Sequence, residues 1–147
     1  MKKLFSAALV LAALSPFGAM AQTSPAGLWK SIDDVSGKPK SLIRITEQGG
    51  EYKGKIEKIF PDPSKEMNPL CDKCEGTQKD QPKVGMTIMS GFKQEGDEFA
   101  GGTILDPESG KVYKSKMSLA EGGKKLNVRG FVGISLFGRS QVWVREE

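Results

Sequence analysis

The segment Gly138-Arg139-Ser140-Gln141-Val142-Trp143-Val144-Arg145, near the C-terminus, predicts a closing β-strand. Far upstream, Gly27-Leu28-Trp29 predicts an opening strand of the same kind. A first strand that begins with Gly-x-Trp and a last strand that ends in Trp-x-Arg indicate a sheet that curls until its two ends meet. Together the two segments favour a closed antiparallel barrel.

The chain between these segments predicts further short strands separated by turns. Residues 111–119 alternate apolar and polar side chains with a period of two, as half-buried strands do. In the segment 85–92, Met86, Ile88 and Ser90 are expected to share one face. The predicted strands cover residues 27–33, 41–47, 52–57, 85–92, 98–105, 111–119, 126–130 and the closing segment.

Glycines and turn residues complete this pattern. Gly54, on an inner face, predicts a bend or a close backbone approach, and Gly101-Gly102 predicts a bulge. Turn signals recur at fairly regular intervals, as in Asp106-Pro107-Glu108-Ser109-Gly110, and no amphipathic helix is convincing. We therefore predict an all-β fold with a single closed antiparallel up-and-down barrel of about eight strands. Eight strands enclose enough room for side chains or for one small ligand.

One long irregular segment, residues 60–83, interrupts the strands. It holds Pro61, Pro63, Pro69 and Pro82 together with both cysteines. Because proline fixes φ and lacks a backbone donor, this segment is neither a helix nor a central strand. So long a loop is uncommon in a compact domain and is often functional. Two interpretations stay open: a flap over one end of the barrel, pinned by its own crosslink, and a functional lid.

The N-terminus, residues 1–21, has the layout of a secretory signal peptide. A basic start precedes an apolar run at 4–14 and a small-x-small cleavage site that ends at Ala21. The apolar run is shorter than the roughly 20 residues that span a bilayer. We therefore favour cleavage over an uncleaved membrane anchor. The domain would then be residues 22–147, located in a bacterial periplasm or, alternatively, secreted from the cell.

Charge and composition exclude several classes of function. The signal peptide carries two lysines and no acidic residue, so its removal lowers the formal net charge of the 147-residue chain from +4 to +2. So small a charge argues against nucleic-acid binding, and no second apolar stretch could span a membrane. The chain has no histidine, which excludes Ser-His-Asp and Cys-His catalysis and His-ligated zinc. We expect no cofactor or metal, and the sequence argues against an enzyme.

Carboxylates are the remaining candidates for catalysis. They occur in pairs at Asp33-Asp34 and Asp97-Glu98. A two-carboxylate mechanism needs a shared cleft and pKa values pushed apart. Both pairs lie beside predicted turns, where solvated acidic residues are expected. We therefore name no catalytic residue.

Cys71-Asp72-Lys73-Cys74 is the one motif whose residue types indicate a specific chemistry. Two cysteines in an oxidising compartment most often form a disulfide, and so small a loop would stabilise the fold by about 2 kcal/mol. A redox site would need Cys71 at a helix N-terminus, whereas the motif lies in a proline-rich loop. A metal site would need two more ligands, and the nearby carboxylates match thiolates poorly. We favour a structural disulfide over these two alternatives.

Residues 131–137 are too apolar for an ordinary exposed loop. The plainer interpretation is a plug that closes the barrel floor near Trp29 and Trp143. The other is an exposed lip for an apolar ligand, a partner or a membrane surface. The side chains that we consider as ligand contacts, besides their expected role in the core, are Met86, Tyr113, Met117 and Phe131.

Gly27-x-Trp29 on the first strand, with Arg145 on the last, resembles the pattern of calycins, the lipocalins and their relatives. The resemblance implies that the tryptophan closes one end of the barrel and that the basic residue packs across it. It makes Gly27, Trp29, Trp143 and Arg145 our candidates for closing the barrel.

A closer resemblance covers nearly the whole predicted domain. The motifs Gly27-Leu28-Trp29, Cys71-x-x-Cys74, Gly101-Gly102-x-Ile104-x-Asp106-Pro107, Gly110-Lys111-x-Tyr113, Arg129-Gly130-Phe131-Val132-Gly133 and Gly138-Arg139-x-Gln141-x-Trp143-x-Arg145 occur in this order. In this set the chain resembles an exported bacterial family catalogued as domain of unknown function 2147. The resemblance implies a small secreted β-barrel and carries over no activity.

Two hypotheses of function follow. The first is a binding module, in which the barrel holds a small apolar or amphipathic molecule and the segment 60–83 is the lid; it predicts an inner cavity. The second is an envelope structural or interaction protein, with a filled barrel that acts through its surface. An enzyme is the third, weakened by the missing histidine. The sequence does not specify an oligomeric state.

Overall fold

The computed structural model describes residues 24–147. The predicted signal peptide lies outside the described residues. Within residues 24–147, no helix has the length and apolar character needed to cross a membrane.

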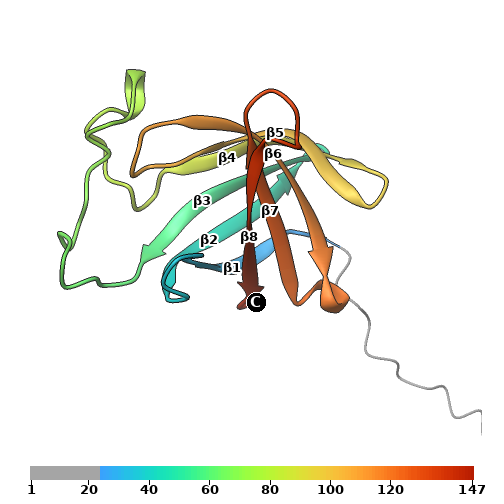
Figure 1. Ribbon diagram of the computed structural model, residues 1–147, viewed down its shortest axis with the longest axis horizontal. Coiled ribbons are helices and arrows are strands. Elements are labelled where there is room, and N and C mark those ends of the chain that lie inside the picture. The colour runs from blue at the N-terminus through green and yellow to red at the C-terminus, as the bar shows by residue number, and fades with distance from the viewer. Residues whose placement is uncertain (1–23) are drawn as a thin grey trace, which may run out of the picture.

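Eight antiparallel strands form one closed barrel in which every strand pairs with its neighbours in sequence (Figure 1). This confirms the predicted fold. Two short 3₁₀ helices interrupt the connections, η1 (Gly76–Gln78) and η2 (Glu121–Gly123). The strands are β1 (Gly27–Ile32), β2 (Pro39–Gln48), β3 (Glu51–Ile59), β4 (Thr87–Glu95), β5 (Glu98–Leu105), β6 (Val112–Ala120), β7 (Lys125–Phe131) and β8 (Gly138–Arg145).

The barrel closes at a short seam between β1 and β8. Trp29 pairs with Arg145 and Lys30 with Val144. Beyond the strands, Glu146 donates its backbone N–H to the carbonyl of Leu28 at 2.8 Å. The predicted meeting of the first and last strands is therefore confirmed, and the extreme C-terminus extends the seam.

The register of β4 departs from the prediction. Met89 pairs with Ile104 of β5 and is buried, whereas the hydroxyl of Ser90 lies in an exposed position 3.4 Å from that of Thr103. Ser90 therefore faces outward, and its predicted place on the inner face was wrong. The register of β4 against β3 shifts between Thr87 and Met89, so that Ile88 and Met89 are both buried and the alternation is reversed before Ser90. A second shift follows near Gly91, which has a φ of 81°, and Phe92 is buried again.

Gly54 of β3 confirms the predicted close approach. A Cβ atom at this position would lie 2.8 Å from the sulfur of Met89 on β4. The strand register also shifts between Phe99 and Gly102, where a bulge was predicted. Strands β3 and β4 therefore approach closely on one side of the barrel, and the Met89 side chain fills the space beside Gly54.

The up-and-down order gives the barrel two different ends. The β1–β2, β3–β4, β5–β6 and β7–β8 connections lie at one end. Gly27 and Glu147 lie at the other end, together with the three remaining turns. In Figure 1 the long β3–β4 connection, drawn in green, extends to the left of the barrel. The two ends differ in what fills them, and this difference defines the candidate site.

Candidate ligand-binding cavity

The end of the barrel that holds Trp29 is sealed. The indole is fully buried and donates its Nε1–H to the carbonyl of Pro25 at 2.8 Å. The guanidinium carbon of Arg145 lies 4.2 Å from the centre of the indole ring. Three of its nitrogens donate to backbone carbonyls, those of Gly123 at 2.7 Å, Ala26 at 2.9 Å and Ser24 at 2.7 Å.

Arg145 thereby joins the N-terminal segment, the β6–β7 turn and the barrel floor. Burial lowers the pKa of its guanidinium from its ordinary value, because the charged form loses hydration. Gly27 lies in the same place with a φ of 142°, and a Cβ atom there would collide with the Arg145 side chain and the carbonyl of Glu147. Three of the four predicted closing residues, Gly27, Trp29 and Arg145, therefore meet at this end.

The opposite half of the barrel contains a cavity of about 350 Å³. This volume lies in the range of small-molecule pockets. Trp143, the fourth predicted closing residue, is buried and presents its ring to this cavity. The aliphatic part of the wall consists of Ile43, Ile56, Ile88, Ile104, Leu105 and Val128. The interior of the barrel is thus packed at one end and hollow at the other.

Few polar groups interrupt the aliphatic wall. The hydroxyls of Ser31 and Ser41 lie 2.6 Å apart and are bonded to each other. Gln141 of β8 accepts the Nε1–H of Trp143 at its side-chain oxygen, at 3.1 Å. Arg139, Gln141 and Trp143 alternate along β8, so this strand carries a cation at the mouth, an amide further in and an indole deepest.

Two turns of the same construction flank the mouth. Both have the sequence Asp-x-x-Ser-Gly-Lys, at residues 33–38 and 106–111. In each, the glycine N–H donates to the aspartate carbonyl at 2.8 Å, and the serine hydroxyl accepts the lysine N–H at 3.3 Å. The β1–β2 and β5–β6 connections are therefore equivalent turns that fix the ends of four strands around the cavity.

Charged side chains at the mouth are paired with one another. Glu108 contacts the ammonium groups of Lys65 at 2.9 Å and Lys40 at 3.3 Å. The hydrogen bond from Lys65 lowers the pKa of the Glu108 carboxyl, against the opposing effect of its partial burial. Arg139 forms an ion pair with Asp34 of the β1–β2 turn. The rim therefore has its charges largely compensated.

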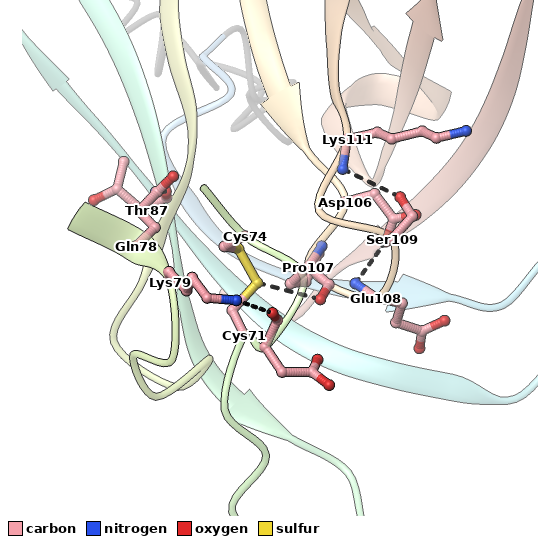
Figure 2. The surroundings of a disulfide bond; sticks show 11 residues. Cys71, Cys74, Gln78, Lys79, Thr87, Asp106, Pro107, Glu108, Ser109 and Lys111 are labelled. Carbon is pink, nitrogen blue, oxygen red and sulfur yellow. Dashed lines mark hydrogen bonds between the residues drawn. A yellow bond between two sulfur atoms is a disulfide. The ribbon is translucent and has the colours of Figure 1, made fainter. Parts of the chain in front are cut away.

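The predicted Cys71–Cys74 disulfide is present and buried (Figure 2). Cys71 Sγ lies 3.4 Å from the carbonyl oxygen of Pro107; a disulfide sulfur has no proton to donate, so this is a packing contact. A Cβ atom on Gly110 would overlap the carbonyl of Lys73. The disulfide loop is thus packed directly against the β5–β6 turn.

This packing bears on both interpretations of the segment 60–83. In the part of the chain that the structure describes, none of the cavity-lining residues comes from this segment. Asp106, Pro107 and Glu108 do line the cavity, and the disulfide loop supports them from outside. The segment therefore braces the rim and does not cover the opening.

The β7–β8 connection lies at the mouth, so its predicted place as a plug at the sealed floor was wrong. Arg129 holds it by donating to the carbonyls of Ser135 at 2.6 Å and Leu136 at 3.3 Å. Because the loop leaves the barrel, its apolar side chains have few partners. They are exposed at Val132 (67%), Ile134 (59%), Leu136 (75%) and Phe137 (69%). Val132 and Phe137 also line the cavity, which makes the loop an apolar lip of the opening.

The four predicted ligand contacts separate into two pairs. Tyr113 and Phe131 line the cavity. Met86 and Met117 are buried elsewhere and do not line it. Met117 pairs with Val128 and Phe99 on the neighbouring strands and is buried between them. Contact of any of these side chains with a ligand stays a prediction.

Sequence reasoning missed Gln141 as a cavity residue. The signal was present, because Trp143 was a candidate for closing the barrel and a strand places every second residue on the same face. Applying that period to β8 puts Gln141 and Arg139 on the inner side. No cluster of three or more acidic or cysteine side chains that could hold a metal ion occurs among residues 24–147.

Comparisons with known proteins agree with this architecture. The sequence profile of the family described as "Uncharacterized protein conserved in bacteria (DUF2147)" matches residues 27–145. Among proteins with curated descriptions, none matches the chain in sequence. The chain is similar in structure to HP1028 of the human pathogen Helicobacter pylori, which belongs to the lipocalin family. The TM-score is 0.71 at 14% sequence identity, with 84% of each chain covered, so this likeness shows the fold alone.

Proposed function

Because the chain belongs to the bacterial family DUF2147 and folds as a lipocalin-like barrel, we propose that it is a binding module for a small apolar or amphipathic molecule. The observation that carries this proposal is the cavity of about 350 Å³ behind an apolar lip. A cavity of this size would hold one small ligand, and its mostly aliphatic wall would favour an apolar body.

The proposal includes a location. The predicted signal peptide would direct the chain to the periplasm, where cleavage after Ala21 would leave Gln22 as the first residue. The Cys71–Cys74 disulfide supports this, because disulfides persist in oxidising compartments. The alternative, a protein with a filled barrel that acts through its surface, is not supported, because the half of the barrel near the mouth is hollow.

Native mass spectrometry of the protein purified from a bacterial periplasm tests the proposal. We expect an extra mass that is lost on denaturation, and a denatured chain that starts at Gln22. Gly130 lines the cavity, and a Cβ atom there would lie at ordinary contact distance from Tyr113 and Ile104. Gly130→Leu should therefore fill the cavity and abolish the extra mass, whereas Asn127→Leu, at an exposed position of the same strand, should retain it.

Two results would count against binding in the cavity. One is a wild-type protein that carries no extra mass and takes up none of a set of apolar probes. The other is an extra mass that persists in Gly130→Leu.

The exposed apolar lip favours a second candidate function, docking of the mouth on a membrane surface. Side chains such as Leu136 are too exposed to stabilise the fold, which is typical of surfaces that contact another apolar phase. Sedimentation with phospholipid vesicles tests this function. The wild type should sediment and the variant Ile134→Ser/Leu136→Ser should stay in solution. Equal sedimentation of the two proteins would exclude the lip as the docking surface.

A further inference from the structure

We propose that Gln141 selects the ligand, and that the cavity takes an aliphatic molecule carrying an uncharged carbonyl group whose oxygen accepts a hydrogen bond from the Gln141 amide. This inference rests on the proposed binding function and adds the chemistry that the cavity recognises. It follows from the orientation of one side chain in the cavity wall.

The orientation of the Gln141 amide is fixed by chemistry. Trp143 approaches it with Nε1 at 3.1 Å, and an indole nitrogen can only donate. The group that faces the indole must therefore be the amide oxygen, so the usual ambiguity between the two ends of a glutamine is removed. The amide nitrogen, with two N–H donors, points to the remaining side.

That nitrogen has no protein partner among the described residues. Gln141 lines the cavity, and among the hydrogen bonds of residues 24–147 none is made by its Nε2. The same residues contain no fully buried side-chain nitrogen or oxygen that lacks a partner. The Nε2 group therefore has exposed surface, and because Gln141 lines the cavity, a molecule in the cavity can accept its hydrogen bond.

The surroundings make this donor selective. Ile43, Ile56, Ile88 and Val128 lie on the same cavity wall and offer no acceptor. A ligand without an acceptor would displace water from Nε2 and leave a donor unpaired, which costs affinity. A site that hydrogen-bonds an oxygen of its ligand discriminates strongly against an analogue that lacks this oxygen. An apolar site discriminates much less against a ligand that carries an extra group.

The charge of the ligand follows from the pairing at the rim. Arg139, the next inward residue of β8 toward the mouth, is held by Asp34, and Lys40 is held by Glu108. A carboxylate inside the cavity would therefore meet neutral donors and no free cation. Burying a charge without a charged partner is costly. A neutral ketone, ester or amide carbonyl matches the neutral amide donor.

The test compares 2-hexanone, hexane and hexanoate as competitors of the apolar fluorophore N-phenyl-1-naphthylamine at neutral pH. The readout is the ratio of the dissociation constants of 2-hexanone and hexane. The difference in hydrophobicity between the two probes is the same for every variant, so it cancels when ratios are compared. Gln141→Glu keeps an oxygen for Trp143 but replaces the N–H donors by an acceptor. Gln141→Met removes the donors without adding charge.

We expect both variants to weaken 2-hexanone relative to hexane by on the order of tenfold, the effect of losing one buried hydrogen bond. Gln94→Glu, the same substitution at an exposed position of β4, should leave the ratio unchanged. Hexanoate should bind the wild type more weakly than 2-hexanone.

Three results would overturn the inference. The first is the same ratio in the wild type and in both Gln141 variants. The second is tighter binding of hexanoate than of 2-hexanone. The third is that no probe displaces the fluorophore. The last result would also overturn the proposed binding function, whereas the first two would leave it standing and reject the role of Gln141 alone.

Discussion

Gly110 and Gly37 occupy the same position in the two Asp-x-x-Ser-Gly-Lys turns, with φ values of 74° and 71°. Substitution by alanine therefore imposes the same backbone strain in both. A Cβ atom on Gly37 would meet nothing within 4 Å, whereas one on Gly110 would overlap the carbonyl of Lys73. We expect Gly37→Ala to cost about 1 kcal/mol in the free energy of unfolding and Gly110→Ala about 3 kcal/mol.

Urea unfolding of the two variants measures this difference. It isolates the close approach of the disulfide loop to the β5–β6 turn, because the strain common to both glycines cancels. Equal midpoints for Gly37→Ala and Gly110→Ala would mean that this approach contributes nothing to stability.

Arg145 is the residue on which the sealed end depends most. Its guanidinium bonds to three backbone carbonyls and covers Trp29, so removal leaves buried acceptors unpaired. We expect Arg145→Met to lower the free energy of unfolding by about 3 kcal/mol. Arg145→Lys should recover little of this loss, because an ammonium group cannot reproduce the planar fork.

The matched control is Arg44→Met, which removes a half-exposed arginine paired with Glu57. Ion pairs of this kind contribute at most about 1 kcal/mol. Chemical denaturation followed by tryptophan fluorescence compares the three variants. A stability of Arg145→Met equal to that of Arg44→Met would contradict the role assigned to Arg145.

At the scale of elements, the disulfide loop and the β5–β6 turn form one unit. Loss of the crosslink in Cys71→Ser/Cys74→Ser should cost about 2 kcal/mol through the freedom gained by the unfolded chain. The contact with Pro107 also predicts a local effect, faster amide hydrogen exchange in residues 106–111. Exchange in the equivalent turn 33–38 should stay unchanged. Uniform acceleration in both turns would show that the loop does not brace the rim specifically.

The ion pairs at the rim predict a dependence of stability on pH. The pKa of Glu108 is lower in the folded protein than its ordinary value of 4.5, chiefly through Lys65. Its contribution is therefore present above about pH 4.5 and is lost as the pH falls through the lower folded value. The side chain is 47% exposed, so we expect less than about 1 kcal/mol.

The wild type loses the contribution of Glu108 to its stability between pH 7 and pH 3, and Glu108→Gln should not show this part of the loss. Urea unfolding at both pH values measures the difference. Glu66→Gln, at an exposed position of the β3–β4 connection next to Lys65, is the control. A Glu108→Gln variant that loses as much stability in acid as the wild type would contradict the assignment.

For the molecule as a whole, the β1–β8 seam is the weakest closure of the barrel, because few residues pair across it. Deleting Glu146 and Glu147 removes their backbone bonds to Leu28 and should cost about 2 kcal/mol. Glu146→Ala/Glu147→Ala keeps these bonds and removes only half-exposed or exposed ion pairs, so it should cost less than about 1 kcal/mol. Thermal unfolding of both variants distinguishes the contribution of the backbone hydrogen bonds from that of the side-chain ion pairs. Equal losses would assign the closure to the side chains.

Much of this architecture could be predicted from the sequence. The strands, their order and the closed barrel follow from period-two alternation and from turn residues, which are local properties of the chain. The close approach at Gly54 was predicted for the same reason. Alternation failed at Ser90, because the register shift at Ile88 depends on the pairing of β4 with β3 and not on the residues beside it.

The sequence by itself determined the barrel, its approximate number of strands and the disulfide, since short-range periodicity and a spacing of three residues suffice for these. Only the tertiary structure decided which end is sealed and which is hollow, that the segment 60–83 braces the rim, and that Gln141 lines the cavity. These features depend on contacts such as Arg145 with Ser24, Gly110 with Lys73 and Glu108 with Lys65. The partners in each pair lie far apart along the chain, and no local pattern records which distant backbone atom a side chain will meet.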